Sequence, residues 1–206
     1  MTEVVEPAPP AEAPPPKKRT STVRNVVEWI LVLGGALLIA LLIRTFLFTT
    51  FWIPSASMEP TLVGQPNRHD RIIVNRLSYK LHSVHRGDII VFEKPPGETA
   101  TTEDGRPVKD LIKRVIGLPG ETVTLRSNHV FVDGKRLQES YLPKGTPTQP
   151  ICGSVTEFKV PKGDVFVMGD NRTNSTDGRC FGPIDEDTIV GRAFVRFWPL
   201  SQIDWL

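Results

Sequence analysis

The stretch "LIKRVIGLPGETVTL", Leu111 to Leu125, is a run of β-branched residues punctuated by glycine and proline, which is typical of β-strands. Similar runs lie on both sides of it, at Asp70–Tyr79, Gly87–Lys94, His129–Leu137, Gly163–Asp170 and Ile189–Leu200. Several of them alternate, and Asp133-Gly134 is a strong hairpin-turn signal. The sequence therefore predicts a mostly antiparallel β domain, and its 206 residues are enough for one such domain with appendages.

An apolar segment precedes this β-rich part. Trp29 to Ile43 is an unbroken run of 15 apolar or glycine residues, and it reaches the length of a membrane span when its neighbours are included. Four basic residues precede the run, whereas Thr45 to Asn67 contains no lysine or arginine, so the positive-inside rule places the N-terminus in the cytoplasm. We expect three regions: a disordered proline-rich cytoplasmic tail with a basic flank (1–24), a transmembrane anchor (25–48) and an extracytoplasmic β-rich domain (49–206).

Small hydroxyl residues follow the apolar segment directly, in "FWIPSASMEPTL", Phe51 to Leu62. One interpretation is that Ser55 to Ser57 forms a small-x-small cleavage site of a removed signal peptide. The other is that one serine is a nucleophile held near the membrane surface. The 24-residue leader and the bulky residues Phe51 to Ile53 favour an uncleaved anchor.

A serine hydroxyl needs an adjacent base to act as a nucleophile. The count of four histidines leaves a Ser/His/Asp triad open, although none of them lies in a recognisable motif: His69, His82, His85 and His129. Lys113 is the other candidate, because alternation along its apolar strand directs Lys113 and Arg114 to opposite faces. Burial would lower the pKa of Lys113 toward that of a general base, whereas a lysine that snorkels at an edge strand would stay charged. The pattern alone does not decide between these two.

Composition excludes some classes of function. The net charge of +2 and the absence of a basic stripe interleaved with aromatic residues give no reason to expect a nucleic-acid partner. The two cysteines, Cys152 and Cys180, show no metal-ligand spacing with the histidines, so we expect no metal and no cofactor.

Four segments, "PSASMEPTL", "RGDIIVF", "IKRVIGLPGE" and "MGDNRTNSTDGR", occur in the order and approximate spacing that mark bacterial type I signal peptidases, also called leader peptidases. The resemblance covers the chain from the anchor to about Trp198. It implies an antiparallel β-sheet catalytic domain behind one transmembrane helix, in a monomeric, single-pass serine endopeptidase of the bacterial cytoplasmic membrane. The implied reaction is removal of N-terminal signal peptides from exported preproteins after Ala-x-Ala-like sites.

The resemblance also implies roles for individual residues. Ser57 matches the nucleophile and Lys113 the general base, while Ser55 matches the serine that joins the Ser57 backbone N–H in the oxyanion hole. Ser175 matches the serine that orients the lysine, and the supporting acidic and basic pair matches Asp177 and Arg179. Gly178 departs from the family pattern, in which many members have serine, so a hydroxyl role at that position is absent.

Two further questions stay open at this point. An inactive, membrane-anchored homologue that acts as a binding module would lose a residue of the Ser-Lys dyad, and both are present, whereas a related self-cleaving repressor would need a DNA-binding helix-turn-helix. Cys152 and Cys180 both follow the anchor, on the side where a disulfide is chemically permitted. They form either a disulfide or two separate buried thiols, because the sequence gives no distance between them.

Overall fold

Strand β6 (Asp110–Gly117) lies at the centre of the fold. In the computed structural model, which describes residues 22–65, 67–102 and 105–206, every residue of β6 after Asp110 is buried. The strand pairs with β5 (Ile89–Glu93) on one side and with β11 (Asp164–Met168) on the other, antiparallel in both cases. Both faces of β6 are covered, which explains why apolar residues occupy successive positions in it, at 111–112 and 115–116, instead of alternating with polar ones.

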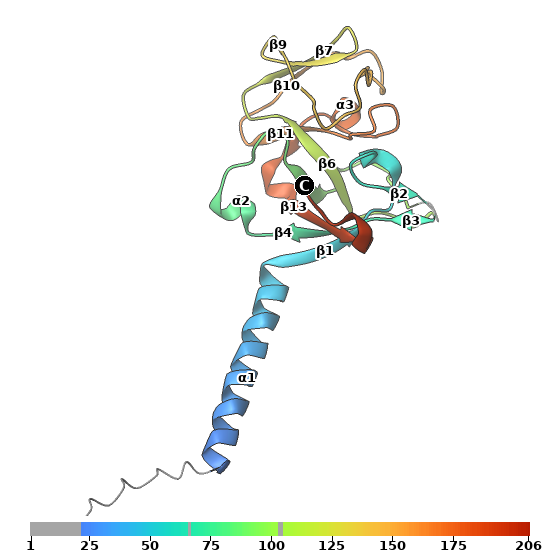
Figure 1. Cartoon of the computed structure of the whole chain (residues 1–206). Helices are drawn as coiled ribbons and strands as arrows, with labels where there is room; N and C mark the ends of the chain where they lie inside the picture. Colours follow the sequence, from blue (N-terminus) through green and yellow to red (C-terminus); the bar gives the residue numbers. More distant parts are fainter. Residues whose placement is uncertain (1–21, 66, 103–104) are drawn as a thin grey trace, which may run out of the picture. The chain divides into compact units, whose positions relative to one another are not determined.

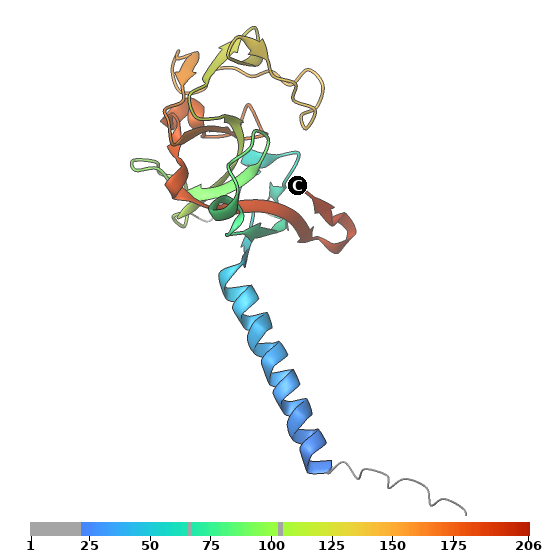
Figure 2. The same ribbon diagram turned by 90° about the vertical axis from the view of Figure 1, so that its left-hand side faces the viewer.

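The main sheet has eight strands, and its pairing is antiparallel throughout. Figures 1 and 2 show that it curls, and β13, drawn in red, pairs with both β4 and β5. The strand order is β1-β4-β13-β5-β6-β11-β12, and β14 pairs with β13. Besides β5, β6 and β11, its strands are β1 (Phe48–Trp52), β4 (Arg71–Asn75), β12 (Ile184–Asp185), β13 (Ile189–Trp198) and β14 (Asp204–Trp205).

The chain between β6 and β11 forms a smaller sheet, at the top of Figure 1. Its order is β10-β7-β8-β9, with bounds β7 (Thr122–Arg126), β8 (His129–Val132), β9 (Lys135–Arg136) and β10 (Glu157–Lys159). Asp133 and Gly134 join β8 to β9 with φ of 46° and 75°, the positive values that a two-residue type I′ turn requires. The hairpin prediction is therefore confirmed. A two-stranded ribbon of β2 (Gly64–Gln65) and β3 (Arg68–His69) completes the described sheets.

The helices of the β-rich unit are single turns. They are η1 (Ala56–Met58), α2 (Ser78–Leu81), α3 (Gly178–Phe181), η2 (Glu186–Thr188) and η3 (Leu200–Gln202). The side chain of Asp177 caps α3 by accepting the backbone N–H of Arg179, which is the usual role of aspartate before a helix. Three hydrophobic clusters fill the unit, one under η1 and β4, one between β5 and β11, and one beneath the smaller sheet.

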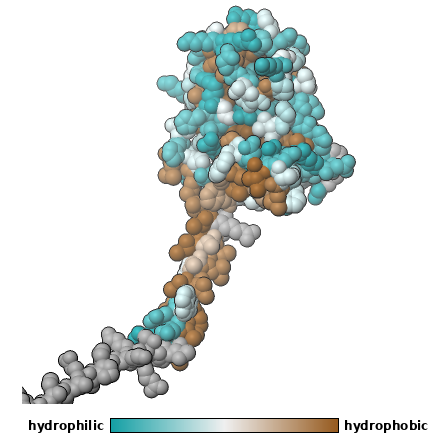
Figure 3. Space-filling view, in the orientation of Figure 1, coloured by the Kyte–Doolittle hydropathy of each residue, from teal (hydrophilic) through white to brown (hydrophobic). Residues whose placement is uncertain are grey.

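Helix α1 (Thr22–Phe46) is the long apolar element of the chain. Val23–Ile43 is long and apolar enough to cross a membrane, and hydrophobic residues run along it in Figure 3. A mostly antiparallel β fold with one N-terminal apolar helix is thus confirmed. Residues 1–21 of the expected tail lie outside the described part of the chain, so the predicted division into three regions stays a prediction.

Candidate active site

The serine motif forms the turn η1 directly after β1. Ser57 and Met58 are both buried, and Met58 packs into the hydrophobic cluster with Ile53 and Leu62. Gly64 lies so close to the turn that a Cβ at this position would clash with the backbone of Ser55. The buried Met58 side chain and the close approach at Gly64 therefore fix the turn that carries the two serines.

Lys113 reaches the same turn from β6. Its Nζ donates to Ser57 Oγ at 2.9 Å and to the carbonyl oxygen of Ile112 at 3.0 Å, and the residue is only 3% exposed. Burial lowers the pKa of Lys113 from an ordinary 10.5 to about 8, although the charge of Asp177 opposes this shift. Because β6 lies between two strands, Lys113 does not snorkel at a sheet edge.

The cavity beside this pair holds about 350 Å³ and is lined by Ser55, Ser57, Lys113 and Ser175, together with residues of the 98–101 segment. Ser55 Oγ donates to Ser57 Oγ at 3.2 Å. None of the four histidines lines the cavity, so the structure offers Ser57 no imidazole base there. Within the described residues there is also no group of three or more side chains that could hold a metal ion.

The loop after β11 supports the turn from the other side. Asn171 donates through its backbone N–H to the carbonyl oxygen of Ser57 at 3.1 Å, and through Nδ2 to that of Ala56 at 3.0 Å. Gly169 allows the loop to approach, because a Cβ there would clash with Ser175 and with the Ser57 backbone. The sequence motif containing Asn171 was recognised, but the support that this residue gives to the nucleophile turn was missed.

Ser175 lines the same cavity as Lys113, and a buried ion pair follows it in the sequence. Ser175 is buried, yet its Oγ has no hydrogen-bond partner among the described residues, so the expected orienting bond to Lys113 stays a prediction. Asp177 and Arg179 form a fully buried ion pair, with Arg179 Nη2 2.8 Å from Asp177 Oδ2. The same carboxylate oxygen accepts the backbone N–H of Gly169 at 2.9 Å, which ties the pair to the supporting loop.

Arg114 and Asp170 form a second buried pair that the sequence analysis missed. Arg114 donates from Nε and Nη2 to the two carboxylate oxygens at 2.9 and 2.7 Å, and Thr61 donates its hydroxyl to Asp170 at 2.6 Å. Tyr141 lies 4.0 Å from the guanidinium, measured to the ring centroid. The sequence does contain a signal for this pair, because Asp170 is the acidic residue of "MGDN" in the same motif as Ser175.

Cys152 and Cys180 are joined in a disulfide, with their Cα atoms 4.9 Å apart. Cys180 lies in α3, next to Arg179. The bridge therefore attaches the segment around residue 152 to the end of the loop that carries Ser175 and the buried ion pair.

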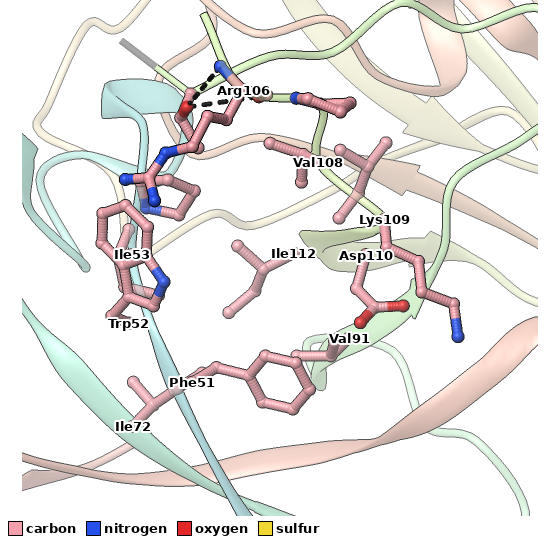
Figure 4. A pocket seen from close by; sticks show the side chains of 14 residues that line it. Phe51, Trp52, Ile53, Ile72, Val91, Arg106, Val108, Lys109, Asp110 and Ile112 are labelled. Atoms are coloured by element: carbon pink, nitrogen blue, oxygen red, sulfur yellow. Dashed lines mark hydrogen bonds between the residues drawn. The ribbon is translucent and has the colours of Figure 1, made fainter. Parts of the chain in front are cut away.

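A second pocket adjoins the cavity and shares part of its wall, including Pro54 and Ile112. It holds about 280 Å³, and its other apolar walls are supplied by β1, β4 and β5 (Figure 4). Arg106, Lys109 and Asp110 are the charged residues that line it. The two pockets share five lining residues, Pro54, Val108, Asp110, Leu111 and Ile112, and together they are called the groove.

A serine hydroxyl in contact with a buried amine, beside a groove of this size, is the kind of nucleophile and base pair that serine hydrolases use. The chain matches the family described as signal peptidase, peptidase S26, over residues 26–198. It belongs to this family and is a serine endopeptidase.

Individual relatives agree with this assignment. The chain is 40% identical to "Signal peptidase I" of Leptolyngbya laminosa, over 86% of this chain and 82% of that protein. It is 41% identical to "Probable signal peptidase I-1" of Synechocystis sp., over 86% and 85% of the two chains. It is 38% identical to "Signal peptidase I T" of Bacillus subtilis, over 91% of each.

Proposed function

We propose that this endopeptidase removes N-terminal signal peptides from exported preproteins, with Ser57 as the nucleophile and Lys113 as the general base. The observation that carries the proposal is the 2.9 Å contact between Ser57 Oγ and the buried Lys113 Nζ. With the pKa of Lys113 lowered to about 8, a useful fraction of the amine is neutral near physiological pH. The neutral amine accepts the hydroxyl proton while the serine oxygen attacks the scissile carbonyl.

The remaining steps use groups that line the same cavity. The Ser55 hydroxyl and the Ser57 backbone N–H stabilise the negative oxygen of the tetrahedral intermediate. The ammonium of Lys113 then gives its proton to the leaving amine of the mature protein. Lys113 subsequently activates a water that hydrolyses the acyl-enzyme at Ser57, and the resting serine is restored.

The groove suits an extended peptide. Side chains alternate along an extended strand, so the residue before the scissile bond and the residue two positions earlier point to the same side. We place the first in the cavity around Ser57 and the second in the outer pocket, which supports cleavage after Ala-x-Ala-like sequences. Backbone hydrogen bonds of an added strand supply affinity without a fixed sequence.

Helix α1 is proposed as an uncleaved, single-pass anchor in the bacterial cytoplasmic membrane. Its large apolar side chains, such as Trp29 and Leu33, are exposed, as a lipid environment requires. The basic residues before its apolar run support a cytoplasmic N-terminus and an external peptidase unit. The serine turn follows the helix closely in sequence, where the cleavage site of a membrane-inserted signal peptide emerges.

Cleavage of a preprotein by the detergent-solubilised full chain tests the proposal. Ser57→Ala and Lys113→Ala should each reduce kcat by more than about 10⁴-fold, because a nucleophile and its base act as a unit. Exposed residues of the same types provide matched controls, and Ser201→Ala and Lys135→Ala should keep the parent rate.

Near-parent activity in either site variant would refute the dyad. A parent protein that binds signal peptides without cleaving them would instead identify a membrane-anchored binding module. Circular dichroism of each variant confirms that the fold is retained before rates are compared.

A further inference from the structure

A pocket beside helix α2 is lined by side chains that suit an anion. It holds about 350 Å³ and shares none of its described lining residues with the groove. Its lining includes six polar residues, namely Asn75, Ser78, His82, Ser83, His85 and Arg192. Among the described residues no aspartate or glutamate lines it, whereas Glu186 and Asp187 line two other pockets around α2. The pocket therefore presents hydrogen-bond donors and positive charge without a carboxylate at its wall.

Asp88 holds Arg192 at this wall. Arg192 Nε lies 3.0 Å from Asp88 Oδ1, and the Arg192 side chain remains 43% exposed. The other carboxylate oxygen of Asp88 accepts the Tyr79 hydroxyl and the His85 backbone N–H, each at 3.0 Å. Asp88 is itself buried and is not part of the pocket lining. Within the described part of the chain the two Nη nitrogens of Arg192 have no hydrogen-bond partner, so they can donate to a ligand.

The pocket wall belongs to a row of the main sheet that begins just after helix α1. Arg192 of β13 pairs with Asn75 of β4, and Asn75 pairs in turn with Phe48, the first residue of β1. Between Ile43, where the apolar span ends, and Phe48 the chain is helical as far as Phe46 and then extended. These residues cover about 11 Å, a length comparable to the headgroup layer of a bilayer. If α1 spans the membrane as proposed, the row therefore lies within reach of lipid headgroups.

Exposed leucine in the same pocket favours a lipid over a free ion. Leu81, the last residue of α2, lines the pocket and is 72% exposed, and Leu77 lines it as well. An apolar side chain next to anion-binding donors matches a molecule that has a charged end and an apolar end. Inorganic phosphate would leave Leu81 in water, whereas a phospholipid covers it with its glycerol and first methylene groups.

We propose that this pocket binds the phosphate of an anionic phospholipid headgroup, with Arg192 as a principal donor. The site lies outside the groove and goes beyond the proposed function, on which it rests only for the membrane anchor. The phosphate oxygens accept from the Arg192 Nη nitrogens and from the neighbouring hydroxyl and imidazole donors, while the apolar part of the lipid contacts Leu81. A bound lipid restrains the peptidase unit at the membrane surface through a contact that is separate from α1.

Native mass spectrometry of the full chain in detergent tests the inference, with phosphatidylglycerol and phosphatidylcholine added at equal concentration. The parent protein should retain phosphatidylglycerol in preference to the zwitterionic lipid. Arg192→Gln should weaken the apparent affinity for phosphatidylglycerol about fivefold, the effect expected for one basic residue at an anionic lipid surface. Ser83→Asp places a carboxylate on the pocket wall, at an exposed position, and should weaken it at least as much.

Matched controls change the same charges elsewhere. Lys135→Gln in β9 and Ser154→Asp before β10 are exposed positions that do not line this pocket, and both variants should keep the parent affinity. Circular dichroism checks the fold of each variant first. If Arg192→Gln fails to fold because Asp88 has lost its partner, Ser83→Asp decides the test, since it leaves that ion pair in place.

Several results would overturn the inference. They are equal retention of the two lipids by the parent protein, unchanged affinity in Ser83→Asp, and an equal loss in the control variants. Displacement of phosphatidylglycerol by an equal concentration of inorganic phosphate would identify a site for the free ion and overturn the assignment to a lipid. Lipid retention is measured without a peptide substrate, so a parent protein that cleaves no preprotein but shows the expected lipid preference would refute the proposed function and support this site.

Discussion

Lys113 and Arg114 are adjacent in sequence, and both are buried, yet their surroundings differ in one decisive respect. Arg114 has a carboxylate partner, Asp170, which accepts hydrogen bonds from its Nε and Nη2. Among the residues that the structure describes, Lys113 donates hydrogen bonds to the Ser57 hydroxyl and to a backbone carbonyl. Desolvation without a paired carboxylate lowers the pKa of Lys113, which suits this residue to accept a proton.

The pH dependence of cleavage should follow the proton on Lys113. Activity should rise with pH through a midpoint at about 8, because only the neutral amine accepts the proton of Ser57. A profile of kcat/KM against pH measures this limb. A limb that disappears in a histidine variant, with Lys113 present, would contradict the assignment.

The lowered pKa of Lys113 also makes the stability of the fold depend on pH. The folded pKa of Lys113 lies below its unfolded value, so the unfolded chain holds more protons between about pH 8 and the ordinary 10.5. The contribution of Lys113 to stability therefore rises with pH across that window. The difference in urea midpoint between the parent protein and Lys113→Met should grow in the parent's favour over this range.

Ser55 is expected to matter less than the dyad. Ser55→Ala should lower kcat by about 10²- to 10³-fold, the usual cost of losing one oxyanion donor, with little change in KM. Ser55→Thr keeps the hydroxyl and should recover part of the rate. If Ser55→Ala cleaved at the parent rate, its hydroxyl would have no part in stabilising the intermediate.

At the scale of elements, the site is assembled where three segments meet. The turn η1 supplies the serines, β6 supplies the lysine, and the loop after β11 holds the turn through Asn171. The Arg114–Asp170 pair joins β6 to that loop, and Thr61 joins it to the segment after η1. The contacts that position the nucleophile therefore depend on a buried ion pair that lies outside the reacting atoms.

Removing one member of this pair should destabilise the fold. Asp170→Ala should lower the free energy of unfolding by about 3–5 kcal/mol, because it leaves the Arg114 charge buried without a partner. Urea denaturation measures the change. The double variant Arg114→Met/Asp170→Ala removes the stranded charge and should regain part of the loss, and a double variant less stable than the single one would contradict this explanation.

For the whole molecule, the proposed membrane topology predicts that the disulfide is formed in the native protein. If the peptidase unit lies outside the cytoplasm, Cys152 and Cys180 meet an oxidising environment. Protein isolated from membranes without reductant should take up no alkylating label before reduction and two labels after it. Two labels without reduction would exclude the bridge in the native protein and count against the external location.

The bridge should also contribute to stability. It closes a loop with a sequence separation of 28, for which chain entropy predicts a stabilisation of about 3.5 kcal/mol. The urea midpoints of oxidised and reduced protein measure this contribution.

The strands, the hairpin and the apolar helix were predictable because their signals are local. Each signal lies within a few residues or within one element. These signals are the β-branched runs, the φ preferences of Asp133 and Gly134, and the length of the apolar segment. The order of the four motifs was sufficient to indicate Ser57 and Lys113 through the family resemblance. It gave no distance between them.

Contacts between residues that are far apart in the sequence depend on the packing of the whole fold. The sequence could not show that both faces of β6 are covered, and this is why Lys113 and Arg114 are both buried. Nor could it pair Arg114 with Asp170 or bring Cys152 to Cys180. Each of these depends on packing between segments far apart in the chain, where pKa values and ion pairs are set by burial and neighbours that local sequence does not specify.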